Sequence, residues 1–280
     1  MSATAPTVRT APTKPLHRAT ARLTLDDMST NDTAPVIIAV PCFAGAPWDE
    51  RQLRPFAGWT VVTRRLPEGL GRVEAYADVL AAQVREYARF VLAGDSYGAA
   101  IALELATRRP AGLVGLALSG GFASNPLPIW KAAAARLSRF SFGPLWPHAT
   151  LRFHASQLAS PYDRTAPEPH APNDFRRFFL SHTNRETYAA RVLSVVNFDV
   201  RSRLHEIDVP TLVLSPSYDH LVGRRLTDEL VAGIPDVREI VLERTGHMFR
   251  FTHPDQHGAA IVAFVEREVL GRTRRRPAGP

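Results

Sequence analysis

Short runs of apolar, often β-branched residues alternate with segments of helical spacing along most of the chain, and this alternation limits the fold more than any other feature. Helical spacing is found at residues 73–89, 99–108, 226–232 and 258–270. The apolar runs, which we interpret as strands, are residues 36–40, 59–63, 90–93, 113–118, 210–215 and 238–242. Because continuous apolar strands must be buried on both faces, they indicate a mostly parallel central sheet with helices on both faces. The sequence therefore predicts an α/β fold.

Residues 122–206 interrupt this alternation. They carry no strand pattern but show helical stretches at residues 129–137, 174–180 and 185–196. We therefore expect one α/β core, built from residues 35–121 and 207–270, with residues 122–206 as a helical insertion. Residues 1–34, rich in Thr, Ala and Pro and without hydrophobic periodicity, are expected to be a disordered leader. Residues 271–280 carry four arginines and no acid, and are expected to be a solvated basic tail.

Composition excludes several classes of protein. The 280 residues are 45% hydrophobic and 22% charged, which is typical of a globular protein. No apolar stretch approaches the roughly 20 residues that cross a bilayer, so no membrane span is expected. The single cysteine, Cys42, excludes an internal disulfide and a cysteine-rich zinc module. Low cysteine content fits a reducing compartment, and we expect a cytoplasmic protein.

The net charge of +7 raises the question of a nucleic-acid partner. Residues 122–206 hold most of the excess, with eleven Lys and Arg against six Asp and Glu, but these are not arranged as a nucleic-acid patch. We expect no nucleic-acid partner. A solvated arginine-rich surface is the simpler interpretation, and a surface that steers an acidic partner or an anionic substrate is the alternative.

The sharpest local motif is Gly-Asp-Ser-Tyr-Gly at residues 94–98, between an apolar run and a helical segment. A serine at a sharp strand-to-helix turn sits in strained backbone, and side chains two positions to either side would clash. Gly94 and Gly98 remove those side chains. Ser96 is then presented above the sheet, near a helix N-terminus that favours negative charge. We interpret Ser96 as a nucleophile, and the alternative is a tight turn with a structural serine.

A serine nucleophile needs a general base and an acid that orients the base. Asp219 follows the run at residues 210–215, and His247 follows the run at residues 238–242. In a parallel sheet both loops emerge at the carboxyl edge, as does the loop that holds Ser96. Asp199, within the insertion, and Asp208, which precedes a strand, fit the role of the acid less well.

Two other histidines lie close to His247 in the sequence. His253 and His257 fall on or near the last helical segment, and we expect them to be solvated or capping residues rather than catalytic ones.

The order Ser96, Asp219, His247 resembles that of the α/β-hydrolase superfamily. The resemblance covers residues 34–270 approximately and is carried by residues 94–98, 209–219 and 246–254. It implies that Ser96 attacks an acyl carbon, that His247 transfers the proton and that Asp219 holds the imidazole. It also implies that the insertion at residues 122–206 is a cap over the pocket.

One departure from the family lies after the first strand. The usual His-Gly is replaced by Pro41-Cys42, followed by Phe43. The backbone N–H groups of Phe43 and Tyr97 are expected to form the oxyanion hole, because backbone donors do not depend on side-chain identity. The departure puts the geometry of that hole in question. Cys42 itself is a rival nucleophile at a strand end, but nothing near it in the sequence supplies a base.

These observations predict a serine hydrolase that cleaves a carboxylic ester or thioester, with no cofactor and no metal. The insertion holds 12 of the 24 aromatic residues, which suggests an apolar roof for acyl or aryl groups, or simply the packing of a small helical cap. The expected substrate is a small acyl ester, free or carrier-linked, since the arginine-bearing cap resembles that of carrier-protein methyl-ester esterases of biotin synthesis. The alternatives are an acyltransferase or carbon–carbon bond hydrolase with the same triad, or a non-catalytic ligand-binding protein. The sequence leaves the oligomeric state open.

Overall fold

The structure is a computed structural model, which describes residues 34–127 and 154–271. Residues 35–280 form one unit by their contacts, and the description below concerns that unit. The expected leader up to residue 33, the predicted helix at residues 129–137 and the basic tail from residue 272 lie outside the described residues.

Six strands form one sheet in the order β2-β1-β3-β4-β5-β6, and every adjacent pair is parallel. This confirms the predicted parallel sheet. The strand that leads to the serine motif, β3, is buried along its whole length, as a central strand covered on both faces must be. The strands are β1 (Val36–Val40), β2 (Val61–Thr63), β3 (Phe90–Asp95), β4 (Leu113–Ser119), β5 (Thr211–Tyr218) and β6 (Val237–Gly246).

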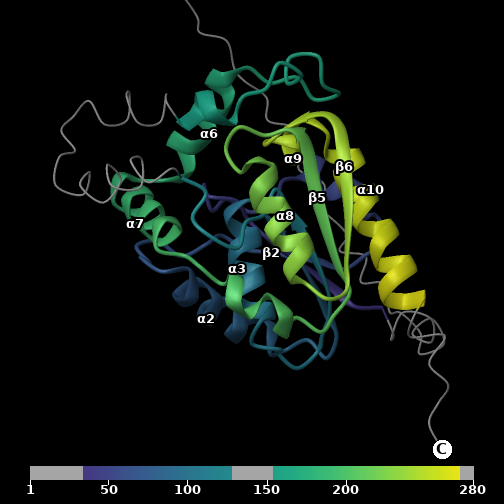
Figure 1. Cartoon of the computed structure of the whole chain (residues 1–280). Coiled ribbons are helices and arrows are strands. Elements are labelled where there is room, and N and C mark those ends of the chain that lie inside the picture. The colour runs from purple at the N-terminus through teal and green to yellow at the C-terminus, as the bar shows by residue number, and fades with distance from the viewer. Residues whose placement is uncertain (1–33, 128–153, 272–280) are drawn as a thin grey trace, which may run out of the picture. The chain divides into compact units, whose positions relative to one another are not determined.

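Helices cover both faces of this sheet (Figure 1). Alternate residues of a strand face opposite sides, so Ile38 and Leu92 belong to one hydrophobic cluster while Ile37 and Val91 belong to another. The first cluster includes residues of α2 (Val73–Val84), α3 (Tyr97–Ala106) and α8 (Gly223–Gly233). The second includes residues of η2 (Arg54–Phe56), α9 (Phe249–Thr252), α10 (Pro254–Phe264) and η4 (Val265–Leu270), and α1 (Glu50–Leu53) packs against α10.

The insertion lies between β4 and β5 and contains α6 (Pro172–His182), α7 (Arg185–Val196) and η3 (Arg201–Glu206). Residues 154–158 are also helical. An isolated antiparallel bridge joins Ser124 to Asp199, so the chain leaves and re-enters the core at neighbouring points. Phe175, Phe179 and Tyr188 of the insertion belong to the same hydrophobic cluster as α2 and α3.

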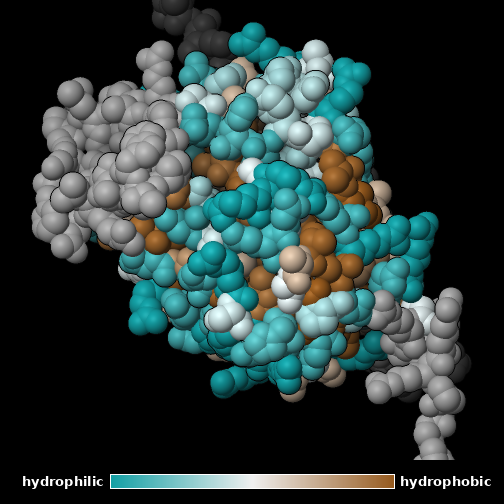
Figure 2. All heavy atoms as spheres, in the orientation of Figure 1, coloured by the Kyte–Doolittle hydropathy of each residue, from teal (hydrophilic) through white to brown (hydrophobic). Residues whose placement is uncertain are grey.

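The surface is mostly polar on the face that Figure 2 shows, with hydrophobic atoms reaching it in separate places. Among the described residues, the large hydrophobic side chains that are exposed are Leu180 and Val241. No helix in the described ranges is long and apolar enough to cross a membrane.

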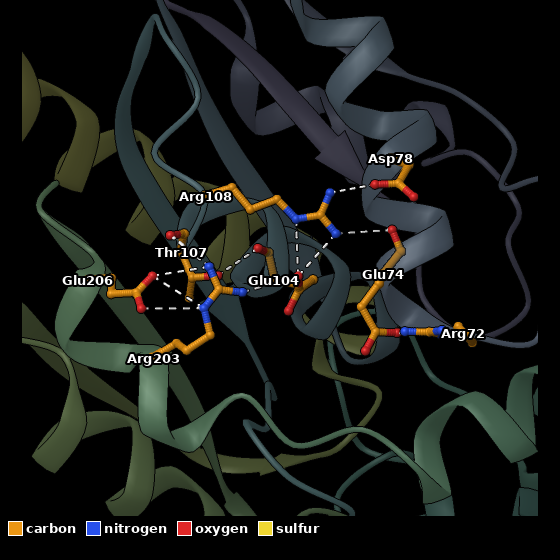
Figure 3. A network of polar contacts seen from close by, with 8 residues as sticks. All are labelled: Arg72, Glu74, Asp78, Glu104, Thr107, Arg108, Arg203 and Glu206. Atoms are coloured by element: carbon orange, nitrogen blue, oxygen red, sulfur yellow. Dashed lines mark hydrogen bonds and ion pairs between the residues drawn. The ribbon is translucent and has the colours of Figure 1, made fainter.

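A polar network joins α2, α3 and η3 (Figure 3). Glu104 of α3 is buried and accepts a hydrogen bond from Arg108 at 3.1 Å, and the guanidinium of Arg203 lies 3.6 Å away. Arg108 also pairs with Asp78 of α2 at 2.6 Å, and Arg203 pairs with Glu206 at 3.1 Å.

Candidate active site

Ser96 occupies the turn between β3 and α3, with φ 54° and ψ −112°. This is a sparsely populated backbone region for a residue with a side chain, and it costs about 1–3 kcal/mol. The Ser96 N–H donates to the carbonyl of Ser119 at 2.8 Å, which holds the turn against the neighbouring strand. A Cβ at Gly94 would collide with the backbone of Ala99, and one at Gly98 would collide with the carbonyl of Val40. The two glycines therefore allow α3 to approach the sheet and Ser96 to adopt this conformation.

A continuous chain of hydrogen bonds links the three residues that the sequence singled out. The hydroxyl of Ser96 and Nε2 of His247 lie 2.8 Å apart, and Nδ1 of His247 lies 2.8 Å from Oδ2 of Asp219. The other oxygen of Asp219 accepts the backbone N–H groups of Leu221 and Val222 at 2.8 and 2.9 Å. Ser96, Asp219 and His247 each follow the end of a parallel strand, which is why residues so distant in sequence meet.

Burial and charge act in opposite directions on this group. Burial by itself raises the pKa of Asp219, but the charge and hydrogen bond of His247, together with the two backbone N–H donors, lower it below its ordinary value. Burial by itself lowers the pKa of His247, but Asp219, assisted by the charge of Asp95, raises it above its ordinary value. Asp219 is therefore held as a carboxylate that stabilises a protonated imidazole.

The competing residues lie in other surroundings. Asp199 is exposed and pairs with Arg201 at 2.6 Å, and Asp208 is exposed, 3.8 Å from Arg109. His253 occupies the N-cap position of α10 and is half-buried, but its side chain makes no capping hydrogen bond to the helix.

For His257 the expectation of a solvated or capping residue is wrong. Its ring is fully buried and its Nε2 lies 2.9 Å from the hydroxyl of Ser119, with Trp48 and Phe249 against the ring. Trp48, from the segment before α1, and Phe249 of α9 lie far from His257 or outside its helix in sequence, so the pattern of the segment itself does not indicate this burial.

The loop after β1 has a defined backbone geometry. The carbonyl of Cys42 accepts the N–H of Gly45 at 2.8 Å, and Gly45 has φ 75°, a conformation that favours glycine. The carbonyl of Phe43 accepts a hydrogen bond from Arg191 at 2.7 Å. Neither the Phe43 N–H nor the Tyr97 N–H has an acceptor within the part of the chain that the structure describes.

The Cys42 thiol is buried, and burial raises its pKa, although the charge of Arg250 acts in the opposite direction. A thiol with a raised pKa is mostly protonated near neutral pH, which makes it a poor nucleophile.

An aromatic cluster surrounds the side chain of Phe43. Its ring lies within 6.3 Å, centroid to centroid, of four others. The four are Tyr97, His154, Phe179 and Tyr188. Burial and then the nearby charge of His247 lower the pKa of His154 to about 4, so this histidine is neutral near pH 7.

Sequence reasoning missed the contribution of the insertion to this region, above all Arg191 and His154. A signal existed for Arg191: it shares one face of a helix with Tyr188 and Val195, at spacings of three and four residues. A cation on an otherwise apolar face suggests a buried polar contact. The described residues contain no group of three or more His, Cys, Asp and Glu that could hold a metal ion.

Comparison with known proteins shows the family to which the chain belongs. A model of the alpha/beta hydrolase family matches residues 13–261. The chain belongs to the alpha/beta hydrolase family. RutD from Variovorax paradoxus, named as a carbamate hydrolase, is 26% identical over 187 residues, which cover 63% of this chain and 65% of RutD. The chain spans less than two thirds of the length of the curated relatives it matches.

Solved structures of alpha/beta hydrolases share the fold. A hydrolase from Pseudomonas aeruginosa superimposes with a TM-score of 0.71 at 20% identity, covering 83% of this chain and 90% of that one. A thermophilic esterase from Thermogutta terrifontis superimposes with a TM-score of 0.70 at 21% identity, covering 84% and 90%. At these identities the likeness concerns the fold alone.

Proposed function

We propose that this alpha/beta hydrolase cleaves a carboxylic ester or thioester through an acyl-enzyme intermediate. The observation that carries the proposal is the unbroken hydrogen-bonded chain from Ser96 through His247 to Asp219. Its geometry is that of a nucleophile, a general base and an orienting acid. The lowered pKa of Asp219 and the raised pKa of His247 support the same assignment.

In the first half of the reaction, Ser96 Oγ attacks the carbonyl carbon of the substrate and passes its proton to Nε2 of His247. The electron pair of the carbonyl bond moves to its oxygen, and the N–H groups of Phe43 and Tyr97 donate to that oxyanion. When the carbonyl re-forms, the bond to the leaving oxygen or sulfur breaks, and the leaving group takes the proton from His247. An acyl group remains on Ser96.

In the second half, a water molecule gives a proton to His247 and its oxygen attacks the acyl carbon. Collapse of the second tetrahedral intermediate releases the carboxylic acid, and Ser96 Oγ recovers the proton. Asp219 stays ionised throughout and stabilises the imidazolium that forms in each half.

The insertion acts in this proposal as a cap whose aromatic residues line the acyl side of the pocket. The rings of Phe179 and Tyr188 lie against Phe43, and the neutral ring of His154 adds no charge to this wall. An apolar wall favours an uncharged acyl or aryl group. RutD is named for carbamates and the Thermogutta protein is an esterase. Hydrolysis of either substrate class begins with attack at a carbonyl carbon.

The test is hydrolysis of p-nitrophenyl esters from acetate to laurate by the wild type and by Ser96→Ala. We expect the wild type to hydrolyse the series with one chain-length optimum, and Ser96→Ala to lose about 10⁴-fold or more in kcat. Ser181→Ala, which changes an exposed serine of α6, should match the wild type. Full activity of Ser96→Ala would contradict the proposal.

The competing functions give different results in the same assay. An acyltransferase would divert the acyl group to an added alcohol or amine in proportion to its concentration. A ligand-binding protein without catalysis would neither hydrolyse the series nor react with a fluorophosphonate.

A further inference from the structure

Arg191 of α7 is a buried cation whose hydrogen-bond partners are all uncharged. Its side chain donates to the carbonyls of Phe43 at 2.7 Å, Pro67 at 3.1 Å and Leu66 at 3.5 Å, and to the hydroxyl of Tyr76 at 3.2 Å. The residue is 1% exposed. Within residues 34–127 and 154–271, no carboxylate lies within 4.0 Å of its guanidinium.

An arginine in this position is costly for the fold. Burial of a charge without a counter-charge is unfavourable, and an apolar side chain of similar length would fill the same space. Arg191 instead supplies N–H groups that donate to a carbonyl of the loop after β1 and to two carbonyls at residues 66 and 67. A Cβ at Gly45 would intrude on its guanidinium, so the loop is shaped to admit this side chain.

The peptides on both sides of Phe43 have hydrogen-bond partners, one from within the loop and one from Arg191. In the peptide between Cys42 and Phe43, the carbonyl is directed at the Gly45 N–H, so the Phe43 N–H, on the opposite side of that plane, points away from the turn. Arg191 holds the carbonyl of the next peptide, between Phe43 and Ala44. Thr183, the last residue before α7's cap, donates to the carbonyl of Ala44 at 3.2 Å. Peptides on both sides of Phe43 are thus held.

The same stretch of α7 also contacts the second proposed oxyanion donor. The hydroxyl of Tyr97 lies 2.6 Å from the hydroxyl of Ser194, which in turn donates to the carbonyl of Arg191 at 2.7 Å. The rings of Tyr97 and Phe43 are in edge contact, with centroids 5.6 Å apart. One turn of an insertion helix therefore contacts both Phe43 and Tyr97.

We propose that Arg191 is a positioning residue for the oxyanion hole: by holding the peptide between Phe43 and Ala44 it restricts the movement of the adjoining Phe43 N–H. Its positive charge, which has no carboxylate within 4.0 Å among the described residues, favours the negative charge that develops on the substrate oxygen. This inference rests on the proposed function. Arg191 acts through the Phe43 peptide, because its guanidinium is buried and bound to protein carbonyls. The insertion would thus contribute to the chemical step as well as covering the pocket.

The test compares Arg191→Met, Arg191→Lys and Arg177→Met in ester hydrolysis. Because the oxyanion forms only during the reaction, Arg191→Met should lower kcat by about 10- to 100-fold and leave KM within about twofold. Arg191→Lys keeps the charge but places its donors on one nitrogen, so it cannot make the four hydrogen bonds of the planar guanidinium, and it should fall between Arg191→Met and the wild type. Arg177→Met, which changes an exposed arginine of α6, should match the wild type.

A transition-state analogue separates positioning from general structural damage. An alkyl trifluoromethyl ketone adds to a serine hydroxyl and leaves an oxyanion, so its affinity should fall in Arg191→Met by the same factor as kcat/KM. Binding of the corresponding alkyl carboxylic acid, the product, should change by less than about twofold, since the acid makes no such oxyanion.

The inference is overturned if folded Arg191→Met keeps kcat within twofold of the wild type, or if its only change is a higher KM. Should Arg191→Met not fold, as judged by near-ultraviolet circular dichroism, Arg191→Gln and Arg191→Lys carry the same comparison. A wild type without activity or fluorophosphonate labelling would refute the proposed function instead. An active wild type with equally active Arg191 variants refutes only the inference.

Discussion

The Ser96–His247–Asp219 group combines strong burial with complementary charge. His247 is 3% exposed, so its two ring nitrogens are hydrogen-bonded to Ser96 and Asp219 instead of to water. Low local polarity strengthens the attraction between the Asp219 carboxylate and a protonated ring. This attraction outweighs the burial that disfavours the charged ring, which is why the pKa of His247 is raised.

The raised pKa of His247 predicts the pH dependence of the proposed reaction. The base must be neutral, and lowering the pH protonates it, so kcat/KM should decline on the acid side through an apparent pKa above the ordinary histidine value of 6.5. In Asp219→Asn the stabilising charge is absent while burial remains, so the acid-side decline of kcat/KM should occur at lower pH. The same substitution should reduce kcat about 10⁴-fold. The measurement is kcat/KM for an activated ester from pH 4 to 9.

Asp199→Asn is the control for this experiment, because Asp199 is an exposed aspartate paired with Arg201. Its profile should coincide with that of the wild type. Asp219 does not set the protonation of the base if the wild-type kcat/KM declines with an apparent pKa at or below 6.5. The same conclusion follows if Asp219→Asn shows the wild-type apparent pKa.

At the residue scale, the sequence was sufficient for the residues that follow strand ends. Ser96, Asp219 and His247 share that position, and the structure places His247 within hydrogen-bond distance of both Ser96 and Asp219. Arg191 could not be assigned in the same way. Three of its four partners are backbone carbonyls of distant segments, and a backbone acceptor cannot be recognised from the residue type that carries it.

At the scale of elements, the network around Glu104 joins three segments that are separate in sequence: α2, α3 and η3 (Figure 3). Glu104 is 5% exposed and forms ion pairs with both Arg108 and Arg203. Asp78, which among the described residues pairs with Arg108 alone, is largely exposed. The buried carboxylate of Glu104 therefore interacts with two guanidinium groups, and the exposed carboxylate of Asp78 contributes a weak surface pair.

Glu104→Ala should lower the free energy of unfolding by about 2 kcal/mol or more, because two partly buried cations lose their shared acceptor. Asp78→Ala, which removes an exposed partner of the same Arg108, should change it by less than about 0.5 kcal/mol. Urea unfolding followed by circular dichroism measures both. Equal effects of the two substitutions would contradict the central place of Glu104.

Element positions were predictable and element ends less so. The predicted helix at residues 185–196 is confirmed as α7. It begins at Arg185 because the side chain of the preceding residue, Asn184, accepts the N–H of Thr187 and caps the helix. The predicted helix at residues 73–89 ends at Val84, before the run that leads into β3. The predicted helix at residues 174–180 begins earlier, at Pro172, since Asp174 accepts the backbone N–H of Ala171.

At the scale of the whole described unit, the sheet order explains where the candidate site lies. β1 and β3 are neighbours, with β2 outside β1 and the later strands on the far side of β3. Strand order reverses between them, and the crevice beyond the carboxyl ends of such strands is where ligands bind in open α/β sheets. Phe43 follows β1 and Ser96 follows β3, so both border that crevice.

Parallel pairing could be inferred from the continuous apolar runs, but strand order could not. The residue types of a strand do not indicate which other strand lies beside it. The role of the insertion was likewise beyond the sequence. Its arginines and aromatic residues were visible as composition, whereas their distribution between surface and site depends on how α7 packs against the loop after β1. Arg177 is exposed and Arg191 is buried, although both are arginines on helices of the same insertion.

The most direct test of the account is the intact mass of the protein after reaction with an alkyl fluorophosphonate, followed by peptide mapping. We predict one added phosphonyl group per chain, located on Ser96, with none added to Ser96→Ala and much slower addition to His247→Ala. Labelling of another residue, or none on the folded wild type, would contradict the claim that Ser96 is an activated nucleophile.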